Sequence, residues 1–190
     1  MKVYEVRANL AVFKQLNLST TELTEQLGID INSDEVMDYV RIGTSNKSFA
    51  DRWGKVVTEF KAPDAFPEAI KIPDITTWKQ TTLVLTEESF AYMGEAMKPF
   101  GEFLPIEVQG NTAYIFKIFS RGEVDQSKCE YEYDEGEVVE VLKIGFTDEC
   151  LEEQPIFYCS HEGFGAMYCT ERFKIACDEF ELEGLLFQEV

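Results

Sequence analysis

The sequence predicts an α+β fold, in which a mostly antiparallel or mixed sheet packs against a few helices. Short apolar or alternating segments recur along the chain, as they do in strands. Only a few stretches show the apolar spacing of three and four residues that is typical of an amphipathic helix. The 190 residues are 45% hydrophobic and include fifteen phenylalanines, which is enough to form a core without a disulfide or a metal.

In the N-terminal third, apolar residues predict a first strand at residues 2–8. Serine and threonine followed by good helix formers predict a short helix at residues 19–27, which Gly28 ends. Residues 33–43 fit either a helical turn or a strand. Residues 56–60 predict another strand, because they are rich in valine and end in phenylalanine.

The segment 62–75 carries Pro63, Pro67 and Pro73. Proline fixes its own backbone angle and pushes the residue before it out of the helical region. We therefore expect an extended loop that crosses the surface.

A strand at residues 81–86 leads into a helix. Thr86 can accept a hydrogen bond from the first helical turn. Phe90, Met93 and Met97 are three and four residues apart, so they share one buried face.

The stretch KPFGEFLPIE then predicts a corner between this helix and a strand. Pro99 cannot continue the helix, and Gly101 supplies the turn that follows. Pro105 lacks a backbone donor, so we expect its strand to lie at a sheet edge or to enter the sheet there.

Later segments add further strands and a second amphipathic helix. The strands are expected at residues 112–119, 138–146, 155–160, 166–170 and 185–190. The helix is predicted from the spacing of Phe173, Ala176, Cys177 and Phe180, and Gly184 ends it. Residues 83–108 and 166–190 thus share the order strand, Thr-Glu cap, helix, glycine, strand. Two such units could pack on one sheet, or the likeness could be that of two ordinary strand–helix–strand segments.

The net charge of −19 is unevenly distributed, because residues 123–153 hold twelve acids and only two bases. A negative field repels nucleic acid and anionic membranes and attracts basic proteins. We therefore expect neither a nucleic acid nor a membrane as a direct partner. Solubility, or adaptation to a salt-rich host, is the alternative explanation of the charge.

The densest acidic stretch contains the residues that we predict to contact a partner. They are Glu130, Tyr131, Glu132, Tyr133, Asp134, Glu135 and Glu137. On a strand, the carboxylates at 130, 132 and 134 would share one face and the two tyrosines the other. Tyrosines beside acids suit recognition of a surface rich in lysine and arginine. The alternative is a solvated hairpin whose tyrosines face the core.

The sequence carries no recognisable signature of a cofactor, a metal or a nucleophile. The five cysteines form no C-x-x-C pair, and no phosphate-binding, dinucleotide-binding, serine-hydrolase or zinc-protease motif occurs. His161, the only histidine, is expected in a turn, with Cys159 pointing to the opposite face of a strand. Acids are so numerous that no carboxylate pair stands out as catalytic. We expect no catalytic, cofactor-binding or metal-binding residues, and a protein that is not an enzyme.

The first ten residues include the charged residues Lys2, Glu5 and Arg7 and form no apolar segment. No apolar run in the sequence reaches the length of a membrane span. Together with cysteines that fit a reduced state, this predicts a cytoplasmic protein. We expect a single domain over residues 1–190, with a possible division into lobes at residues 1–62 and 75–190.

Three pieces carry a resemblance to a known family: LVLTEESF at Leu83–Phe90, GEFLP at Gly101–Pro105, and the terminal CTERF followed by GLLF. Over roughly residues 60–190 the chain resembles immunity-protein family eleven of bacterial polymorphic toxin systems, first catalogued as a domain of unknown function. The resemblance implies a cytosolic partner that binds and neutralises a toxin domain encoded next to it. No binding residues of the family can be carried over.

Three alternative functions are therefore consistent with the sequence. The first is an immunity protein whose partner is a cognate toxin domain, for example a basic one. The second is an acidic adaptor or nucleic-acid mimic that binds a basic host protein. The third is a hydrolase that uses a pair of carboxylates.

Overall fold

The computed structural model describes residues 1–79 and 81–190, and it confirms the α+β class with 25% helix and 38% strand. The strands are β1 (Val3–Ala8), β2 (Gln15–Leu16), β3 (Val57–Thr58), β4 (Phe60–Lys61), β5 (Ile75–Trp78), β6 (Thr82–Thr86), β7 (Gly101–Val108), β8 (Asn111–Ile118), β9 (Glu130–Asp134), β10 (Glu137–Lys143), β11 (Ile156–His161), β12 (Phe164–Thr170) and β13 (Leu185–Glu189). The α-helices are α1 (Thr20–Gln26), α2 (Val36–Val40), α3 (Glu87–Met97), α4 (Asp148–Glu153) and α5 (Glu171–Glu179). Short 3-10 helices are η1 (Ala50–Arg52), η2 (Lys98–Phe100) and η3 (Gln126–Lys128).

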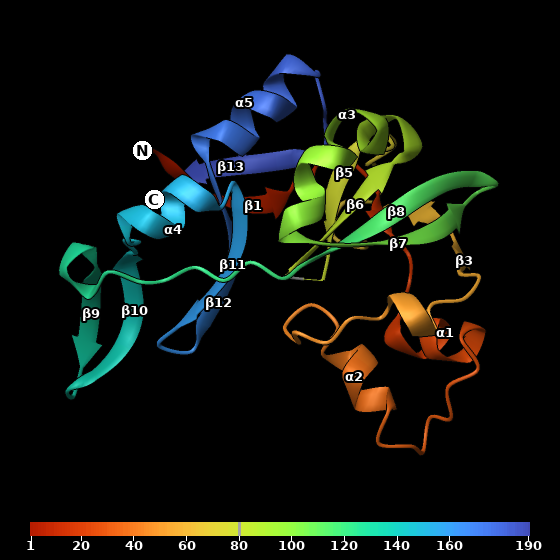
Figure 1. Ribbon diagram of the computed structural model, residues 1–190, viewed down its shortest axis with the longest axis horizontal. Helices are drawn as coiled ribbons and strands as arrows, with labels where there is room; N and C mark the ends of the chain where they lie inside the picture. The colour runs from red at the N-terminus through yellow and green to blue at the C-terminus, as the bar shows by residue number, and fades with distance from the viewer. Residues whose placement is uncertain (80) are drawn as a thin grey trace.

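The first of the two larger sheets has the strand order β3-β7-β8-β6-β5. Its pairs are antiparallel, except that β3 runs parallel to β7. Figure 1 shows α3 on one side of this sheet and α1 and α2 on the other. On the side where α1 and α2 lie, Tyr39 and Phe49 are buried in one core cluster with Leu104 and Ile115 of the sheet.

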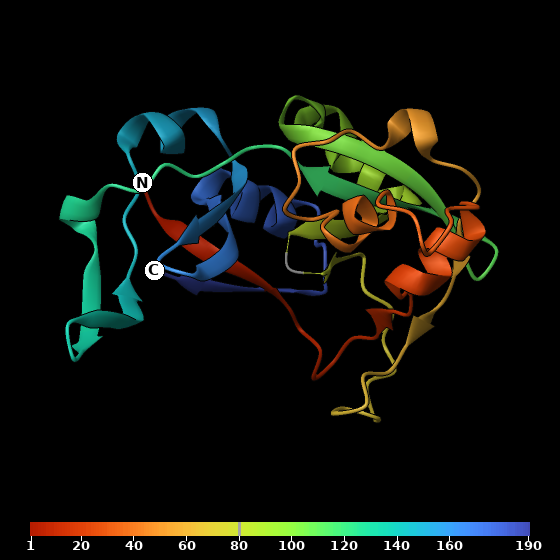
Figure 2. The same cartoon turned by 90° about the horizontal axis from the view of Figure 1, so that it is seen from below.

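The second sheet has the order β11-β12-β1-β13 and is antiparallel throughout. One of its faces packs with α5 and with α3 in a core that both sheets share, where Val6 and Phe173 meet Phe116 and Met93. The opposite face is partly covered by α4 and the segment before it. Figure 2 shows β1 and β13 running side by side, with β13 at the margin.

The two similar sequence segments form two similar units, and each lies in its own sheet rather than in a common one. In the unit β6–α3–β7, both strands pair antiparallel with β8 between them. In the unit β12–α5–β13, both strands pair antiparallel with β1. Each unit is therefore a pair of parallel strands joined by a helix and separated by one antiparallel strand. The likeness of the two segments is structural, as the shared order of caps and glycines predicted.

Most predicted elements are present, and the ambiguous residues 33–43 form the helix α2. The loop prediction for residues 62–75 is confirmed up to Ile75, where β5 begins. Strands β2 and β5, helix α4 and the three 3-10 helices were not predicted. The possible lobe boundary at residues 62–75 does not coincide with the boundary between the sheets, because β1 pairs with β12 and β13.

The corner between α3 and β7 lies where it was predicted, but Gly101 does not form a turn. Pro99 lies in η2, and Gly101, with φ −180°, is extended and begins β7. A Cβ atom on Gly101 would lie 2.2 Å from the Lys117 carbonyl oxygen, so only glycine allows this close approach. Pro105 lies where β7 has no strand on its outer side, since β3 joins only at Glu107 and Val108. The indole Nε1 of Trp53 donates to the Pro105 carbonyl there, at 2.8 Å.

Candidate protein-binding site

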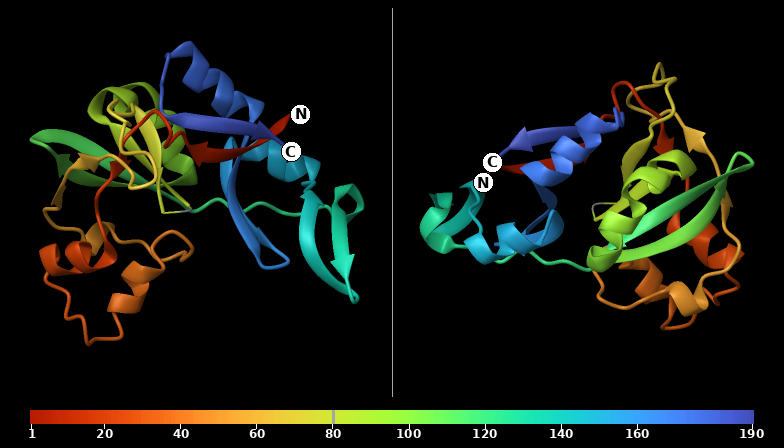
Figure 3. Two further views of the ribbon diagram at one scale, coloured as in Figure 1. Left: turned by 180° about the vertical axis from the view of Figure 1, so that it is seen from behind. Right: turned by 45° about the horizontal axis from the view of Figure 1, so that its top comes forward.

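Strands β9 and β10 form a two-stranded hairpin of their own, hydrogen-bonded to neither larger sheet. It projects from the body of the protein in Figure 1, and both views of Figure 3 show it apart from the larger sheets. All seven predicted contact residues lie on β9, in its turn or at the start of β10. Glu135 and Gly136 form the turn with φ values of 48° and 91°. Two positive φ values in a two-residue loop match the right-handed twist of the flanking strands.

One face of the hairpin concentrates like charges. Asp134 lies opposite Glu137, and Glu132 lies opposite Glu140. Like charges directly across two strands are destabilising. Only Glu130 faces an opposite charge, because the Nζ of Lys143 lies 4.0 Å from its carboxylate. The acidic face therefore costs the isolated hairpin stability.

The tyrosines occupy the other face, as alternation predicted, but they do not face the core. Tyr131 and Tyr133 lie opposite Val141 and Val138. The Tyr133 side chain is 61% exposed, and its ring centroid is 6.1 Å from that of Tyr131. The alternative of core-facing tyrosines is therefore wrong, because the hairpin is not packed on the core.

A contact between side chains connects the hairpin to the second sheet. The hydroxyl of Tyr131 lies 2.7 Å from Nε2 of His161. The neighbouring Cys129 thiol, and then burial, raises the pKa of Tyr131 to about 12, so the phenol keeps its proton at neutral pH. His161 is the last residue of β11, and the predicted turn begins only after it.

A groove of about 650 Å³ separates β10 from the open face of the second sheet. On the sheet side, Glu5 and Arg7 form an ion pair of 2.6 Å within this groove. Leu142 and Phe164 line it as well, and they are 59% and 47% exposed. Neither apolar residue was predicted, since their exposure depends on the projecting position of the hairpin.

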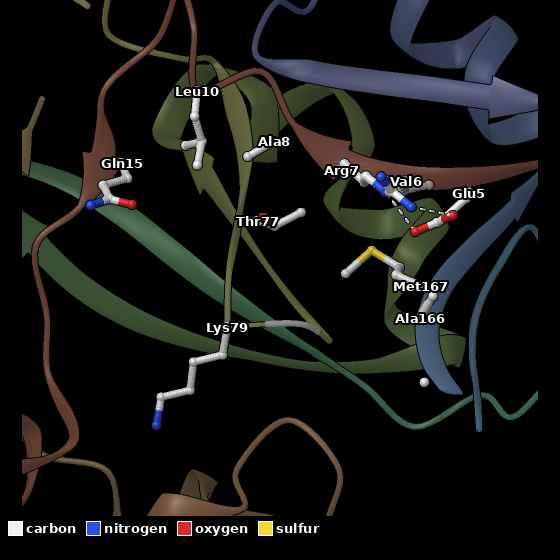
Figure 4. A pocket seen from close by; sticks show the side chains of 11 residues that line it. Glu5, Val6, Arg7, Ala8, Leu10, Gln15, Thr77, Lys79, Ala166 and Met167 are labelled. Atoms are coloured by element: carbon white, nitrogen blue, oxygen red, sulfur yellow. Dashed lines mark hydrogen bonds and ion pairs between the residues drawn. The ribbon is translucent and has the colours of Figure 1, made fainter. Parts of the chain in front are cut away.

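Another pocket, of about 490 Å³, lies between β1, β5 and β12 and is shown in Figure 4. Its charged residues already have partners within the protein. Arg7 is paired with Glu5, and Lys79 donates to the Thr20 hydroxyl at 2.7 Å and to the Tyr39 carbonyl at 3.2 Å. Burial lowers the pKa of Lys79. This pocket therefore brings together no free acid and base in the part of the chain that is described.

The cysteines are free thiols, and four of the five are buried. The expectation that Cys159 and His161 point to opposite faces is wrong, because residues two apart on a strand share a face. Even so, the pair does not form a nucleophile and base. Burial raises the pKa of the Cys159 thiol to about 11, and the His161 ring is held by Tyr131.

Residues 1–79 and 81–190 contain no group of three or more histidine, cysteine or acidic side chains arranged to hold a metal ion. Over the same residues, no helix combines the length and the apolar character needed to cross a membrane. No model of a protein family matches the chain, and no curated protein matches it either.

Proposed function

We propose that this chain is a cytoplasmic immunity protein, which binds and neutralises a cognate bacterial toxin domain through the β9–β10 hairpin. The observation that supports this most is the acidic face of the hairpin, where two pairs of carboxylates lie opposite each other. The hairpin projects from the protein and is hydrogen-bonded to neither larger sheet. The resemblance of residues 60–190 to immunity-protein family eleven supports the same function.

A two-stranded hairpin is only marginally stable in water. The pairs Glu132–Glu140 and Asp134–Glu137 lower that stability further. A basic surface placed over this face replaces repulsion by attraction, so binding and ordering of the hairpin reinforce each other. The exposed ring of Tyr133 offers an aromatic anchor of the kind that is enriched in interfaces.

The partner that fits this face is a basic toxin domain, such as a nuclease whose nucleic-acid site is positively charged. The net charge of −19 steers such a partner toward the protein. Association is therefore expected to be fast at low ionic strength and to slow as salt is added.

An acidic adaptor or nucleic-acid mimic would use the same face on a basic host protein, so the partner encoded beside the gene distinguishes the two functions. A hydrolase using two carboxylates would instead need a pocket where acids converge. The groove beside β10 holds Glu5, Glu140 and Glu189, but Glu5 is engaged by Arg7 and Glu189 by Lys2. Binding is therefore the function that we favour.

Titration calorimetry and stopped-flow association against the toxin domain encoded next to the gene test this proposal. The hairpin variant carries Glu130→Gln, Glu132→Gln and Asp134→Asn. The control carries Asp64→Asn, Glu68→Gln and Glu179→Gln, which removes the same charge from exposed positions elsewhere. We expect the hairpin variant to associate at least about tenfold more slowly at low salt, and the control to stay near the wild-type rate.

Equal slowing of both variants would show that only the overall charge matters and would move the interface off the hairpin. Absence of binding by the wild-type protein would overturn the immunity function itself.

A further inference from the structure

We propose that the outer edge of β13 is a second docking site, at which an extended segment of a basic protein adds to the second sheet as a fifth strand. This site does not depend on the function proposed above, although Gln188, Glu189 and Val190 also line the groove beside β10. It rests on the backbone geometry of β13, on the interruption of the other sheet edges and on the net charge of the chain.

β13 pairs with β1 in an unbroken register, from Leu185 opposite Ala8 to Glu189 opposite Tyr4. Just beyond the strand, the Val190 N–H donates to the Val3 carbonyl at 3.1 Å. Backbone direction alternates along a strand, so every second residue from 190 backwards bonds to β1. The N–H and C=O groups of Leu185, Phe187 and Glu189 therefore point away from β1.

These three outward residues form no backbone hydrogen bond with any residue of 1–79 or 81–190. Figure 2 shows no strand or helix beyond β13 on that side. Three consecutive outward N–H and C=O pairs are the template that an added strand uses in β-augmentation.

The other edges of the two larger sheets are each interrupted by hydrogen bonds to neighbouring segments or, on β7, by Pro105, which has no N–H. At β11, Tyr158 exchanges backbone hydrogen bonds with Ser120 at 3.1 Å and Gly122 at 2.8 Å. At β3, the side-chain amide of Gln26 bonds both the N–H and the C=O of Val57, at 2.6 and 3.0 Å.

At β5, the outer N–H of Ile75 donates to the Glu183 carbonyl at 3.2 Å. Natural proteins protect their sheet edges in such ways, because an open edge pairs with other chains. Among the described residues, β13 therefore offers the longest uninterrupted run of free outward backbone groups on these sheet edges.

The sequence LLFQE of β13 has neither the proline, the lysine nor the bulge that would discourage pairing. Leu186 is 50% exposed beside the edge. The last twenty residues hold six acids and two bases, and each whole chain carries a net charge of −19. Two copies would repel each other, whereas a basic segment would be attracted. The occupant that fits is therefore an extended segment in which basic and apolar residues alternate.

Amide hydrogen exchange of the full, ¹⁵N-labelled chain tests the site directly. The probe is a synthetic heptapeptide of alternating lysine and valine. We expect it to slow exchange of the outward amides of Leu185, Phe187 and Glu189 by about tenfold or more. The amides of Leu186 and Gln188 are already bonded to β1 and should change little. The same peptide with N-methyl groups along one edge should have no effect.

A pair of matched variants completes the test. Leu186→Lys places a charge beside the open edge and should abolish the protection, whereas Leu142→Lys, an equally exposed change on the hairpin, should leave it intact. Protection or chemical-shift change confined to residues 130–143 would mean that the peptide binds the acidic face, and would overturn the proposal. Unchanged outward amides would overturn it as well. Protection that grows with protein concentration in the absence of peptide would identify a second copy as the occupant and would contradict the basic partner.

Discussion

The buried lysine of the first sheet should make the stability of the protein rise at alkaline pH. Lys117 is fully buried on β8. Its Nζ donates to the Ser45 carbonyl at 2.6 Å and lies 4.3 Å from the centre of the Phe119 ring. Replacing Lys117 by methionine removes the charge and keeps a flexible side chain of similar length.

The effect follows from proton binding. Burial lowers the pKa of Lys117 from 10.5 to about 8, against the opposing influence of Glu102. Between these two values the unfolded chain binds a proton that the folded chain does not, so raising the pH favours the folded state. Below pH 8 both states are protonated, and the folded state bears the full cost of the buried charge. Integrated from pH 7 to pH 10, the shift corresponds to about 2.5 kcal/mol of added stability.

Urea unfolding of the wild type and Lys117→Met at pH 7 and pH 10 measures this contribution. The difference in free energy of unfolding, wild type minus variant, should rise by about 2.5 kcal/mol between the two pH values. Lys55→Met is the control, because its side chain is 75% exposed and the change removes the same charge from the surface. A wild-type-minus-variant difference that is the same at both pH values would refute the reasoning, and one that falls would show that the charged form is favoured by folding.

Two further substitutions test the corner and the hairpin. Gly101→Ala should lower the free energy of unfolding by about 1–3 kcal/mol, because the new methyl group meets the Lys117 carbonyl. Gly54→Ala, whose nearest contact would be 3.5 Å away, should change it little in the same urea titration. Tyr131→Phe should speed hydrogen exchange of the hairpin amides by roughly fivefold, the effect of losing about 1 kcal/mol of hydrogen bonding to His161. Its global unfolding midpoint should stay unchanged, and a shifted midpoint would contradict a local role for this contact.

The sequence predicts those parts of the fold that leave a local signal. Strand β8 and helix α3 were predicted from apolar periodicity, and Thr86 indeed accepts a hydrogen bond from Ser89 N–H as the cap of α3. Strand β5 was missed because it is only four residues long and directly follows a proline-rich loop. Helix α4 was missed because its six residues carry four acids and no apolar stripe.

Pairing partners leave no local signal. β1 lies at the N-terminus and pairs with strands that begin at residues 164 and 185, so its position reflects packing of the whole chain. The same reason limits prediction of the site. The acids and the turn of the hairpin could be predicted, but the contact between Tyr131 and His161 joins residues that are thirty positions apart. The open edge of β13 follows only from its pairing with β1 on one side and the absence of a paired strand on the other.

The charges that contribute to stability and the surfaces proposed for binding lie in different parts of the protein. Lys117 and its cross-strand neighbour Glu102 face the side of α1 and α2, where Glu102 accepts from the Ser48 hydroxyl at 2.7 Å and from the Phe49 N–H at 2.9 Å. These charges hold the loop before η1 against the first sheet. The hairpin and the open edge of β13 belong to the other half, around the second sheet. Neither Lys117 nor Glu102 lies on either candidate surface. Lys117→Met should therefore change the pH dependence of stability while leaving partner association at its wild-type rate.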